Sequence, residues 1–302
     1  MITTTTNDHN WAQRGFGGPD PGAAPRNVRD LTSQADIVAL LPDPASAQSC
    51  LDLADDAADA VHDRIAAVHI GADPLAMLVS AEEIELQMLR DLEEGSTHER
   101  FERVKRLFDE WKLGAPHRQS LMLGDFQGDL RRCVTNVCRN ASLVVTPYKG
   151  NLDARDVFHN VLFYEGKLVL VPPASGYRGR LLDHVLIGWK PHEHSRRTMV
   201  AARRWLVAAN RITVLCVDDM PSRHYETTAR EICRHLGVEA EIVVTSSAGR
   251  SVGNTILDFG TSVNASCILI GAFKHGYLLE LLLGRVTYRL LSHANVPLLM
   301  SH

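Results

Sequence analysis

The sequence predicts an α/β protein with two consecutive halves of the same element order, each a parallel five-stranded sheet covered by helices on both faces. Three observations support this prediction. Short runs that are apolar throughout alternate with longer stretches whose apolar residues recur at helical spacing. Strands without a polar face are typical of parallel sheets that are buried on both sides. The series restarts after residue 182, so one pattern is read twice along the 302 residues.

The first half supplies five apolar runs separated by four helical stretches. The runs that we expect to form strands are residues 35–41, 65–71, 117–124, 141–147 and 167–173. Helical spacing covers residues 46–64, 81–112, 128–140 and 153–166, as the positions of Leu51, Leu53, Ala54 and Ala58 illustrate for the first of them. We expect the longest helix to be irregular at "EEGSTHE".

The second half repeats this order. Its expected strands are residues 183–189, 212–217, 239–245, 266–271 and 296–300, and its expected helices are residues 195–209, 222–237, 252–264 and 285–294. Gly237 is a C-capping glycine for the second helix. The tripeptide "NAS" stands before the fourth strand of each half, at Asn140–Ser142 and Asn264–Ser266, which indicates an internal duplication. Right-handed crossovers make each half a doubly wound, Rossmann-like sheet.

The chain divides into four segments. Residues 1–33 are rich in Thr, Gly, Pro, Asn and Asp, and we expect a disordered tail there. Residues 34–173 form the first domain and residues 184–302 the second. Residues 174–183 are the linker, because Pro and Gly interrupt both neighbouring elements in "PPASGYRGRLL".

Composition narrows the class of protein. A formal net charge of -4 gives no general electrostatic basis for binding nucleic acid. No apolar run approaches the roughly 20 residues that span a bilayer, and the first residues lack the pattern of a secretory signal. None of the six cysteines forms a CxxC pair, and several lie in apolar runs. We therefore expect a cytoplasmic, reduced protein without a membrane or nucleic-acid partner.

Residues 267–300, "CILIGAFKHGYLLELLLGRVTYRLLSHANVPLLM", carry the most specific pattern. Gly271 follows the fourth strand of the second half, Gly284 precedes a helix, and "NVPLLM" leads into the last strand. In these residues the chain resembles the universal stress protein family in its tandem form, whose domains have an adenine nucleotide alpha hydrolase-like fold. The resemblance covers the second half along its whole length, as a domain with a partial nucleotide-binding loop. The first half resembles the family only in element order, as a degenerate copy.

The resemblance implies a stress-response protein that binds an adenine nucleotide, such as ATP, in the second domain. Glycines permit close backbone approach, and the first turn of a helix offers unpaired N–H groups and a positive dipole end to phosphates. The contacts carried over from the family are Gly188, Trp189, Lys190, Val217, Ile270, Gly271, Lys274, His275, Gly284, Arg285, Val286 and Thr287. In the first half the glycine pair is absent from "TPYKGNLDARD", and we expect no nucleotide there.

Three positions depart from the family pattern. Lys274 replaces the second glycine, Arg285 replaces a small residue, and Lys190 stands where nucleotide-binding members carry an acid. On one reading these cations hold an anion through their side chains, and Mg²⁺ is not required because its carboxylate ligand is missing. On the other reading the long side chains fill the phosphate space, and the protein is a scaffold or interaction module. Asp218 and Asp219 are candidates to neutralise Lys190 and Lys274.

Other groups of residues are weaker evidence for a functional site. His192 and His194 in "PHEHS" suit a solvated turn better than a metal site, because no cysteine accompanies them. The serines of "TSSAGRS" lack a nucleophile elbow, so a turn that caps the next helix is favoured over hydrolase chemistry, and we expect no enzyme. Trp189 either stacks on a base or packs in the core. An enzyme of adenylated substrates ranks last, because no Ser-Gly-Gly run is present.

The resemblance also implies how the halves meet. The family's dimers pack through their fifth strands, here "KLVLVPP" and "VPLLM". We therefore expect an intramolecular pseudo-dimer in which "VPLLM" is buried against the first half. A homodimer of the whole chain is a further expectation.

Overall fold

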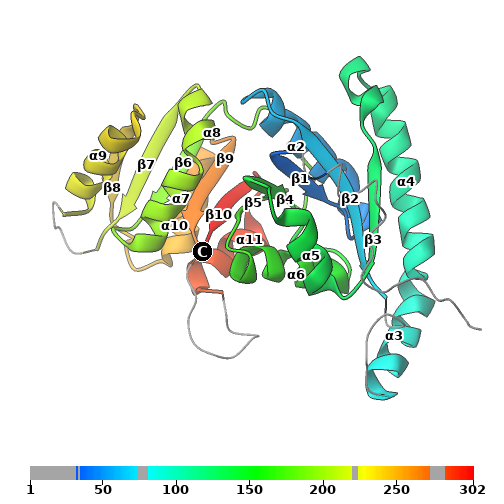
Figure 1. Cartoon of the computed structure of the whole chain (residues 1–302). Helices are drawn as coiled ribbons and strands as arrows, with labels where there is room; N and C mark the ends of the chain where they lie inside the picture. The colour runs from blue at the N-terminus through cyan, green and yellow to red at the C-terminus, as the bar shows by residue number, and fades with distance from the viewer. Residues whose placement is uncertain (1–31, 33–34, 74–80, 220–223, 273–282) are drawn as a thin grey trace, which may run out of the picture.

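The computed structural model describes residue 32 and residues 35–73, 81–219, 224–272 and 283–302 (Figure 1). The expected disordered tail, residues 1–33, lies outside the described residues apart from Thr32. All described strands belong to one open sheet with the order β3-β2-β1-β4-β5-β10-β9-β6-β7-β8. Each half contributes five parallel strands to this sheet, as the sequence predicts.

The first half provides one side of the sheet. Its strands are β1 (Ile37–Leu40), β2 (Ile65–Ala72), β3 (Leu123–Gly128), β4 (Leu143–Val145) and β5 (Leu168–Val171). Its helices are α2 (Pro44–Asp59), α3 (Ala81–Glu94), α4 (Thr97–Leu113), α5 (Leu130–Cys138) and α6 (Leu152–His159), with short helical turns η2 (Pro116–Ser120) and η3 (Asn160–Tyr164). The expected irregularity in the long helix is the break between α3 and α4. Gly95 has a φ of 81° there, and Ser96 and Glu99 form a capping box that starts α4.

The second half provides the other side. Its strands are β6 (Val185–Trp189), β7 (Ile212–Val217), β8 (Glu241–Thr245), β9 (Cys267–Gly271) and β10 (Leu298–Ser301). Its helices are α7 (Glu193–Ala201), α8 (Arg203–Ala208), α9 (His224–Leu236), α10 (Val252–Ser262) and α11 (Arg285–His293). Gly237 follows α9 with a φ of 67°, so it has the left-handed conformation expected of a C-capping glycine.

The halves are joined through their fifth strands. β10 pairs with β5 in antiparallel register, with Leu298 opposite Val171 and Met300 opposite Val169. Leu298, Leu299 and Met300 are buried, so the expectation for "VPLLM" is confirmed. A second contact lies on one face of the sheet, where the Trp205 indole of α8 donates to the Ala57 carbonyl of α2 at 3.0 Å.

Two hydrophobic cores lie on opposite faces of this sheet, and each contains residues of both halves. One core packs under α2, α4, α7, α8 and α9, and it includes Leu51, Val104 and Trp205. The other packs under α5, α6, α10 and α11, and it includes Phe158 and Leu290. Figure 1 shows these helices as two layers around the strands. The six cysteines are all buried and free.

One strand lies elsewhere than expected. Residues 117–120 form the turn η2 rather than the start of a strand, and β3 covers Leu123–Gly128. β3 pairs only with β2 and ends the sheet, so its side chains alternate between buried and partly exposed. An edge strand has no continuous apolar run, and the rule that locates central strands therefore misplaces it.

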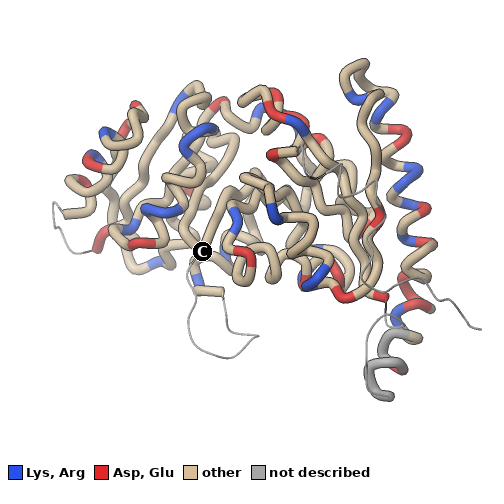
Figure 2. Tube along the Cα trace, in the orientation of Figure 1, with Lys and Arg blue, Asp and Glu red and all other residues tan. Residues whose placement is uncertain are grey.

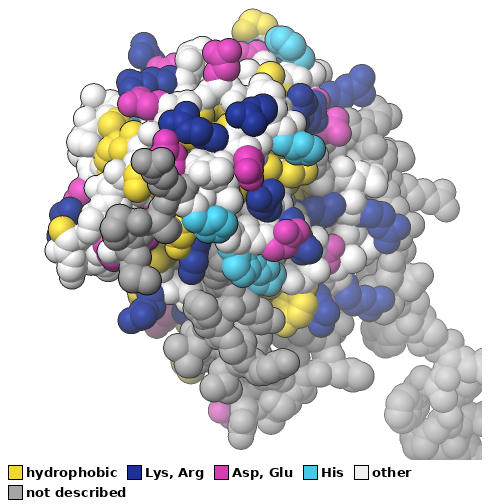
Figure 3. Space-filling view, turned by 90° about the vertical axis from the view of Figure 1, so that its left-hand side faces the viewer, with side chains coloured by type: hydrophobic (Ala, Val, Ile, Leu, Met, Phe, Trp, Pro, Cys, Tyr) yellow, Lys and Arg dark blue, Asp and Glu magenta, His cyan; other side chains and the backbone are white. Residues whose placement is uncertain are grey.

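Charged residues of both signs are spread over the outer helices, as Figure 2 shows most clearly along α4. On the face of the second half seen in Figure 3, Lys and Arg side chains are interspersed with Asp and Glu. Within the described residues, no helix has the length and apolar character needed to cross a bilayer.

Candidate functional site

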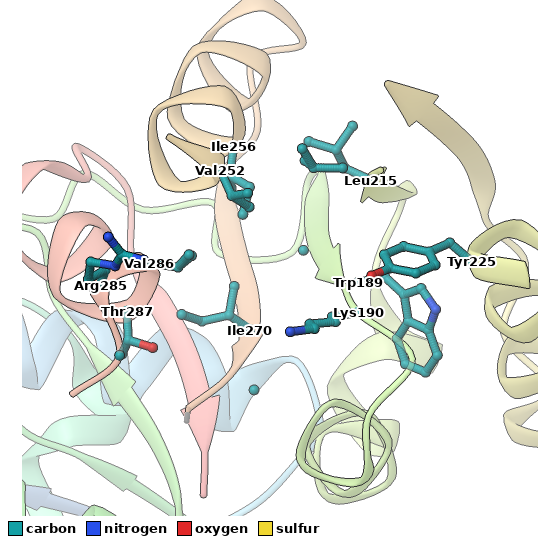
Figure 4. Close-up of a pocket in the computed structure, with 14 residues that line it drawn as sticks. Trp189, Lys190, Leu215, Tyr225, Val252, Ile256, Ile270, Arg285, Val286 and Thr287 are labelled. Atoms are coloured by element: carbon teal, nitrogen blue, oxygen red, sulfur yellow. The ribbon is translucent and has the colours of Figure 1, made fainter. Parts of the chain in front are cut away.

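A cavity of about 320 Å³ opens at the carboxyl ends of β6, β7 and β9, between α9, α10 and the start of α11 (Figure 4). The fourteen residues that line it are Gly188, Trp189, Lys190, Leu215, Val217, Tyr225, Val252, Ile256, Ile270, Gly271, Gly284, Arg285, Val286 and Thr287. Ten of the twelve residues expected from the resemblance are among them, and Lys274 and His275 lie outside the described residues. Doubly wound sheets bind ligands at this edge.

The start of α11 is one wall of the cavity. Gly284 is its N-cap and supplies no side-chain hydrogen bond, so the first N–H groups of the helix lack a side-chain cap. Thr287, in the first turn, is only 1% exposed, and Figure 4 shows its hydroxyl turned toward the cavity. No hydrogen bond of this hydroxyl to another described residue is found, and its oxygen is not among the buried atoms that lack a partner, so it is accessible from the cavity. An accessible hydroxyl at an uncapped helix start is suited to an anionic ligand group.

Neither Gly271 nor Gly284 is required at its position by a positive φ. Gly284 has a φ of -57°, and Gly271 is absent from the residues with positive φ. A Cβ at Gly271 would lie 2.9 Å from the Ser195 amide nitrogen and 3.0 Å from the His194 carbonyl carbon. Gly271, which lines the cavity, therefore lets α7 begin directly against the end of β9.

Two cations from different elements line the cavity. Lys190 follows β6 and Arg285 begins α11, and Figure 4 shows them on different sides of the open space. Both side chains are exposed. The fourteen lining residues include no carboxylate, so the charge of this described lining is positive.

Asp219 is bound to the loop after β8. Its carboxylate accepts hydrogen bonds from the Ser246 hydroxyl at 2.8 Å, the Ser247 hydroxyl at 2.8 Å and the Ser247 amide at 2.6 Å. These bonds, the one from the Ser247 hydroxyl foremost, lower the pKa of Asp219. The same loop caps the next helix as expected, because the Ser251 hydroxyl accepts from the Asn254 amide.

Trp189 belongs to the wall rather than to an open stacking surface. Its side chain is buried among the core residues, and the indole N–H donates to the Thr228 hydroxyl of α9 at 3.3 Å. Beside it, Figure 4 shows the Tyr225 hydroxyl turned toward the cavity. Burial raises the pKa of Tyr225, so its hydroxyl is protonated near neutral pH and can donate or accept a hydrogen bond.

Sequence reasoning missed four lining residues: Leu215, Tyr225, Val252 and Ile256. Two spacing patterns in the sequence could have identified three of these four residues. Leu215 lies two residues before Val217 and so shares its face of β7. Val252 and Ile256 are four apart on α10, which places them on one helix face. Tyr225 carried no such signal, because its position depends on how α9 packs against the sheet.

The rings of His192 and His194 stack on one another at the start of α7. Their ring centroids lie 5.1 Å apart, and the His194 ring stacks on His302 at 4.7 Å. The His192 ring accepts from the His194 amide and so caps α7. Among the residues with described positions, no group of three His, Cys, Asp or Glu side chains has metal-binding geometry.

The corresponding place in the first half holds an internal ion pair. Asp153 lies in the first turn of α6, which follows β4 as α11 follows β9, and it is 1% exposed. The Arg90 side chain donates from Nη1 to Asp153 Oδ1 at 2.9 Å, and its Nη2 lies 2.7 Å from Oδ2. Arg100 Nη2 approaches the same carboxylate at 3.6 Å. Asn151 caps α6 by accepting from the Ala154 amide.

Comparisons with known proteins agree with the fold. Residues 217–302 match the model of the Universal stress protein family. No curated protein sequence matches the chain. A universal stress protein from Archaeoglobus fulgidus DSM 4304 has a similar structure, with a TM-score of 0.61 at 15% identity over 89% of this chain and 98% of that one. At this identity the likeness shows the fold alone.

Two further structures have lower scores. A functionally unknown protein from Pseudomonas aeruginosa PAO1 has a TM-score of 0.49 at 12% identity, covering 90% of this chain and 94% of that one. A universal stress protein from Archaeoglobus fulgidus in complex with dAMP has a TM-score of 0.30 at 21% identity, covering 39% of this chain and 96% of that one.

Proposed function

We propose that this chain, which carries a universal stress protein domain at residues 217–302, binds an adenine nucleotide in the cavity between β6, β9 and α11. The observation that carries the proposal is the hydroxyl of the buried residue Thr287, which faces an open cavity from the uncapped start of a helix. A phosphate placed there accepts hydrogen bonds from this hydroxyl and from the first N–H groups of α11. The cavity volume of about 320 Å³ lies within the usual range of roughly 300–1,000 Å³ for small-molecule sites.

The charges of the lining favour an anion without a metal ion. Arg285 at a helix start is electrostatically unfavourable unless a negative group is near, and the described lining provides none. Mg²⁺ is held by carboxylates and phosphate oxygens, and among the described lining residues the charged groups are the cations Lys190 and Arg285. We therefore propose that the nucleotide binds without Mg²⁺.

The first domain, residues 34–173, takes no nucleotide in this proposal. Asp153 already places a carboxylate at the start of α6, where an anion would otherwise lie, and Arg90 and Arg100 neutralise it. The degenerate domain then serves to complete the sheet. We also propose that residues 174–183 are the linker and residues 184–302 the second domain. We further propose a cytoplasmic stress-response protein that is not an enzyme and that can form homodimers.

A protein-interaction module is the second candidate, and one observation favours it. On α3, Met88, Leu89 and Leu92 are exposed, with Leu92 at 83%, although apolar side chains on a helix usually pack against the protein. This candidate requires no ligand in the cavity. The two candidates therefore differ in what the purified protein binds.

The test is to denature the purified chain, chromatograph the supernatant for released nucleotide, and measure thermal shifts with ATP, ADP and AMP, each with and without Mg²⁺. A bound ligand at 100 times its Kd stabilises the folded state by about 2.7 kcal/mol. We expect such a stabilisation, and we expect it to persist in EDTA. Absence of both released nucleotide and shift would leave the interaction module as the function.

The Thr287→Val variant gives a matched test of the site, because it removes one hydroxyl at nearly constant shape. We expect it to weaken nucleotide binding about tenfold, as the loss of one hydrogen bond to a charged group predicts. Arg197→Ala is the control, because Arg197 is exposed, pairs with Glu193 and does not line the cavity. Equal affinities for Thr287→Val and the unchanged protein would contradict the assignment of this hydroxyl.

A further inference from the structure

Lys190 lies at the centre of the three strand ends that line the cavity. It follows β6, whose neighbours in the sheet are β7 and β9, so it stands at the middle strand of the three that line the cavity. In Figure 4 its side chain points into the space between Tyr225 on one side and Arg285 and Thr287 on the other. The apolar residues Leu215, Val252 and Ile256 line the rest of this space.

This arrangement orders the parts of a nucleotide. The helix start with Arg285 and Thr287 suits the 5′-phosphate. The apolar residues near Leu215 and Tyr225 suit the base, because a base is largely apolar on its faces and polar at its edge. The ribose then lies between them, and Lys190 is the charged side chain that points to this position.

The sign of the charge at the ribose position carries information about the ligand. In nucleotide sites of doubly wound sheets, a carboxylate near the ribose accepts a hydrogen bond from its hydroxyl, whereas a cation accommodates a phosphate on that hydroxyl. An ammonium group has only donors and cannot replace the carboxylate in the first role. Lys190 therefore suits an anionic group on the ribose better than a free ribose hydroxyl.

We propose that the preferred ligand of this cavity is an adenosine nucleotide that carries a second phosphate on its ribose 2′ or 3′ hydroxyl. The inference rests on the proposed nucleotide site and specifies its ligand class. Two separated phosphates match two cations on different walls of the cavity, whereas AMP pairs only with Arg285. ADP and ATP place their additional phosphates along the 5′ chain, away from Lys190.

The test is isothermal titration calorimetry of the full chain in EDTA with AMP, ADP, adenosine 2′,5′-bisphosphate and adenosine 3′,5′-bisphosphate. We expect one bisphosphate to bind at least about tenfold more tightly than AMP, the gain expected from one charge-assisted contact. ADP carries the same number of phosphates as the bisphosphates and controls for phosphate number. If ADP gains as much as the bisphosphates, the position of the second phosphate does not matter and the inference fails while the proposed function stands. If no nucleotide binds, both fail.

Two variants separate Lys190 from general electrostatics. Lys190→Met keeps the chain length and should lower the affinity for the bisphosphate about tenfold more than the affinity for AMP. Lys190→Glu restores an acceptor for a ribose hydroxyl and should reverse the preference toward AMP. Arg197→Met removes one positive charge from exposed α7 and should leave the ratio of affinities unchanged. A ratio that is the same in Lys190→Met as in the unchanged protein overturns the inference, and circular dichroism confirms that each variant is folded.

Discussion

Gly188 and Gly271 show at the scale of single residues how the cavity depends on close packing. A Cβ at Gly271 would meet backbone atoms of α7 at 2.9 and 3.0 Å, and these cannot move without shifting the helix. A Cβ at Gly188 would meet the side chains of Ile270 at 3.0 Å and Ile256 at 3.2 Å, which can rotate. Gly271→Ala should therefore reduce the free energy of unfolding by about 1–3 kcal/mol, and Gly188→Ala by less. Urea denaturation of the two variants measures the difference, and an equal loss would contradict this account of Gly271.

The family resemblance implied that Lys190 and Arg285 belong to one site, and both line the same cavity. That they bind a ligand stays a prediction. Tyr225 was missed because its side chain reaches the cavity only through the packing of α9. The reason given for Gly271 was also incomplete, since its contact with Ser195 joins segments that the sequence does not relate.

At the scale of elements, the starts of α6 and α11 differ in how their first turns are satisfied. α6 has a capping side chain, Asn151, and a buried carboxylate, Asp153, that two arginines from α3 and α4 neutralise. Removing one partner of a buried ion pair leaves an uncompensated charge and costs about 3–5 kcal/mol. Asp153→Ala should lose stability of this size in urea denaturation. Asp183→Ala is the control, because its pair with Arg180 is largely exposed and exposed pairs contribute about 0–1 kcal/mol. Similar losses in both variants would show that the Asp153 pair is not structural.

The contrast between these two helices also marks the limit of sequence reasoning about elements. The absence of glycines from "TPYKGNLDARD" was enough to predict a first half without nucleotide, although that prediction still awaits its test. The ion pair itself was not predicted, because Arg90 and Asp153 are 63 residues apart and belong to elements with no pattern in common. The edge strand β3 was misplaced for a related reason, since its burial depends on having a single neighbour.

At the scale of the whole molecule, the sheet and both cores run continuously through the two halves. β5 and β10 are hydrogen-bonded, and residues of both halves share each hydrophobic core. A chain built this way should unfold as one cooperative unit rather than as two domains. Trp111 on α4 reports the first half and Trp189 on β6 the second, so variants that keep one of these tryptophans can follow each half by fluorescence.

The continuous sheet also predicts how a ligand bound in the second half changes the stability of the first half. A ligand that binds only the folded state raises the free energy of unfolding of the whole cooperative unit. Nucleotide in the cavity of the second half should therefore shift the Trp111 transition as much as the Trp189 transition, although Trp111 lies on α4, bonded to Asp52 of α2, and does not line the cavity. Urea denaturation with and without saturating nucleotide measures both shifts. A shift confined to Trp189 would mean that the β5–β10 pairing joins two halves that unfold separately.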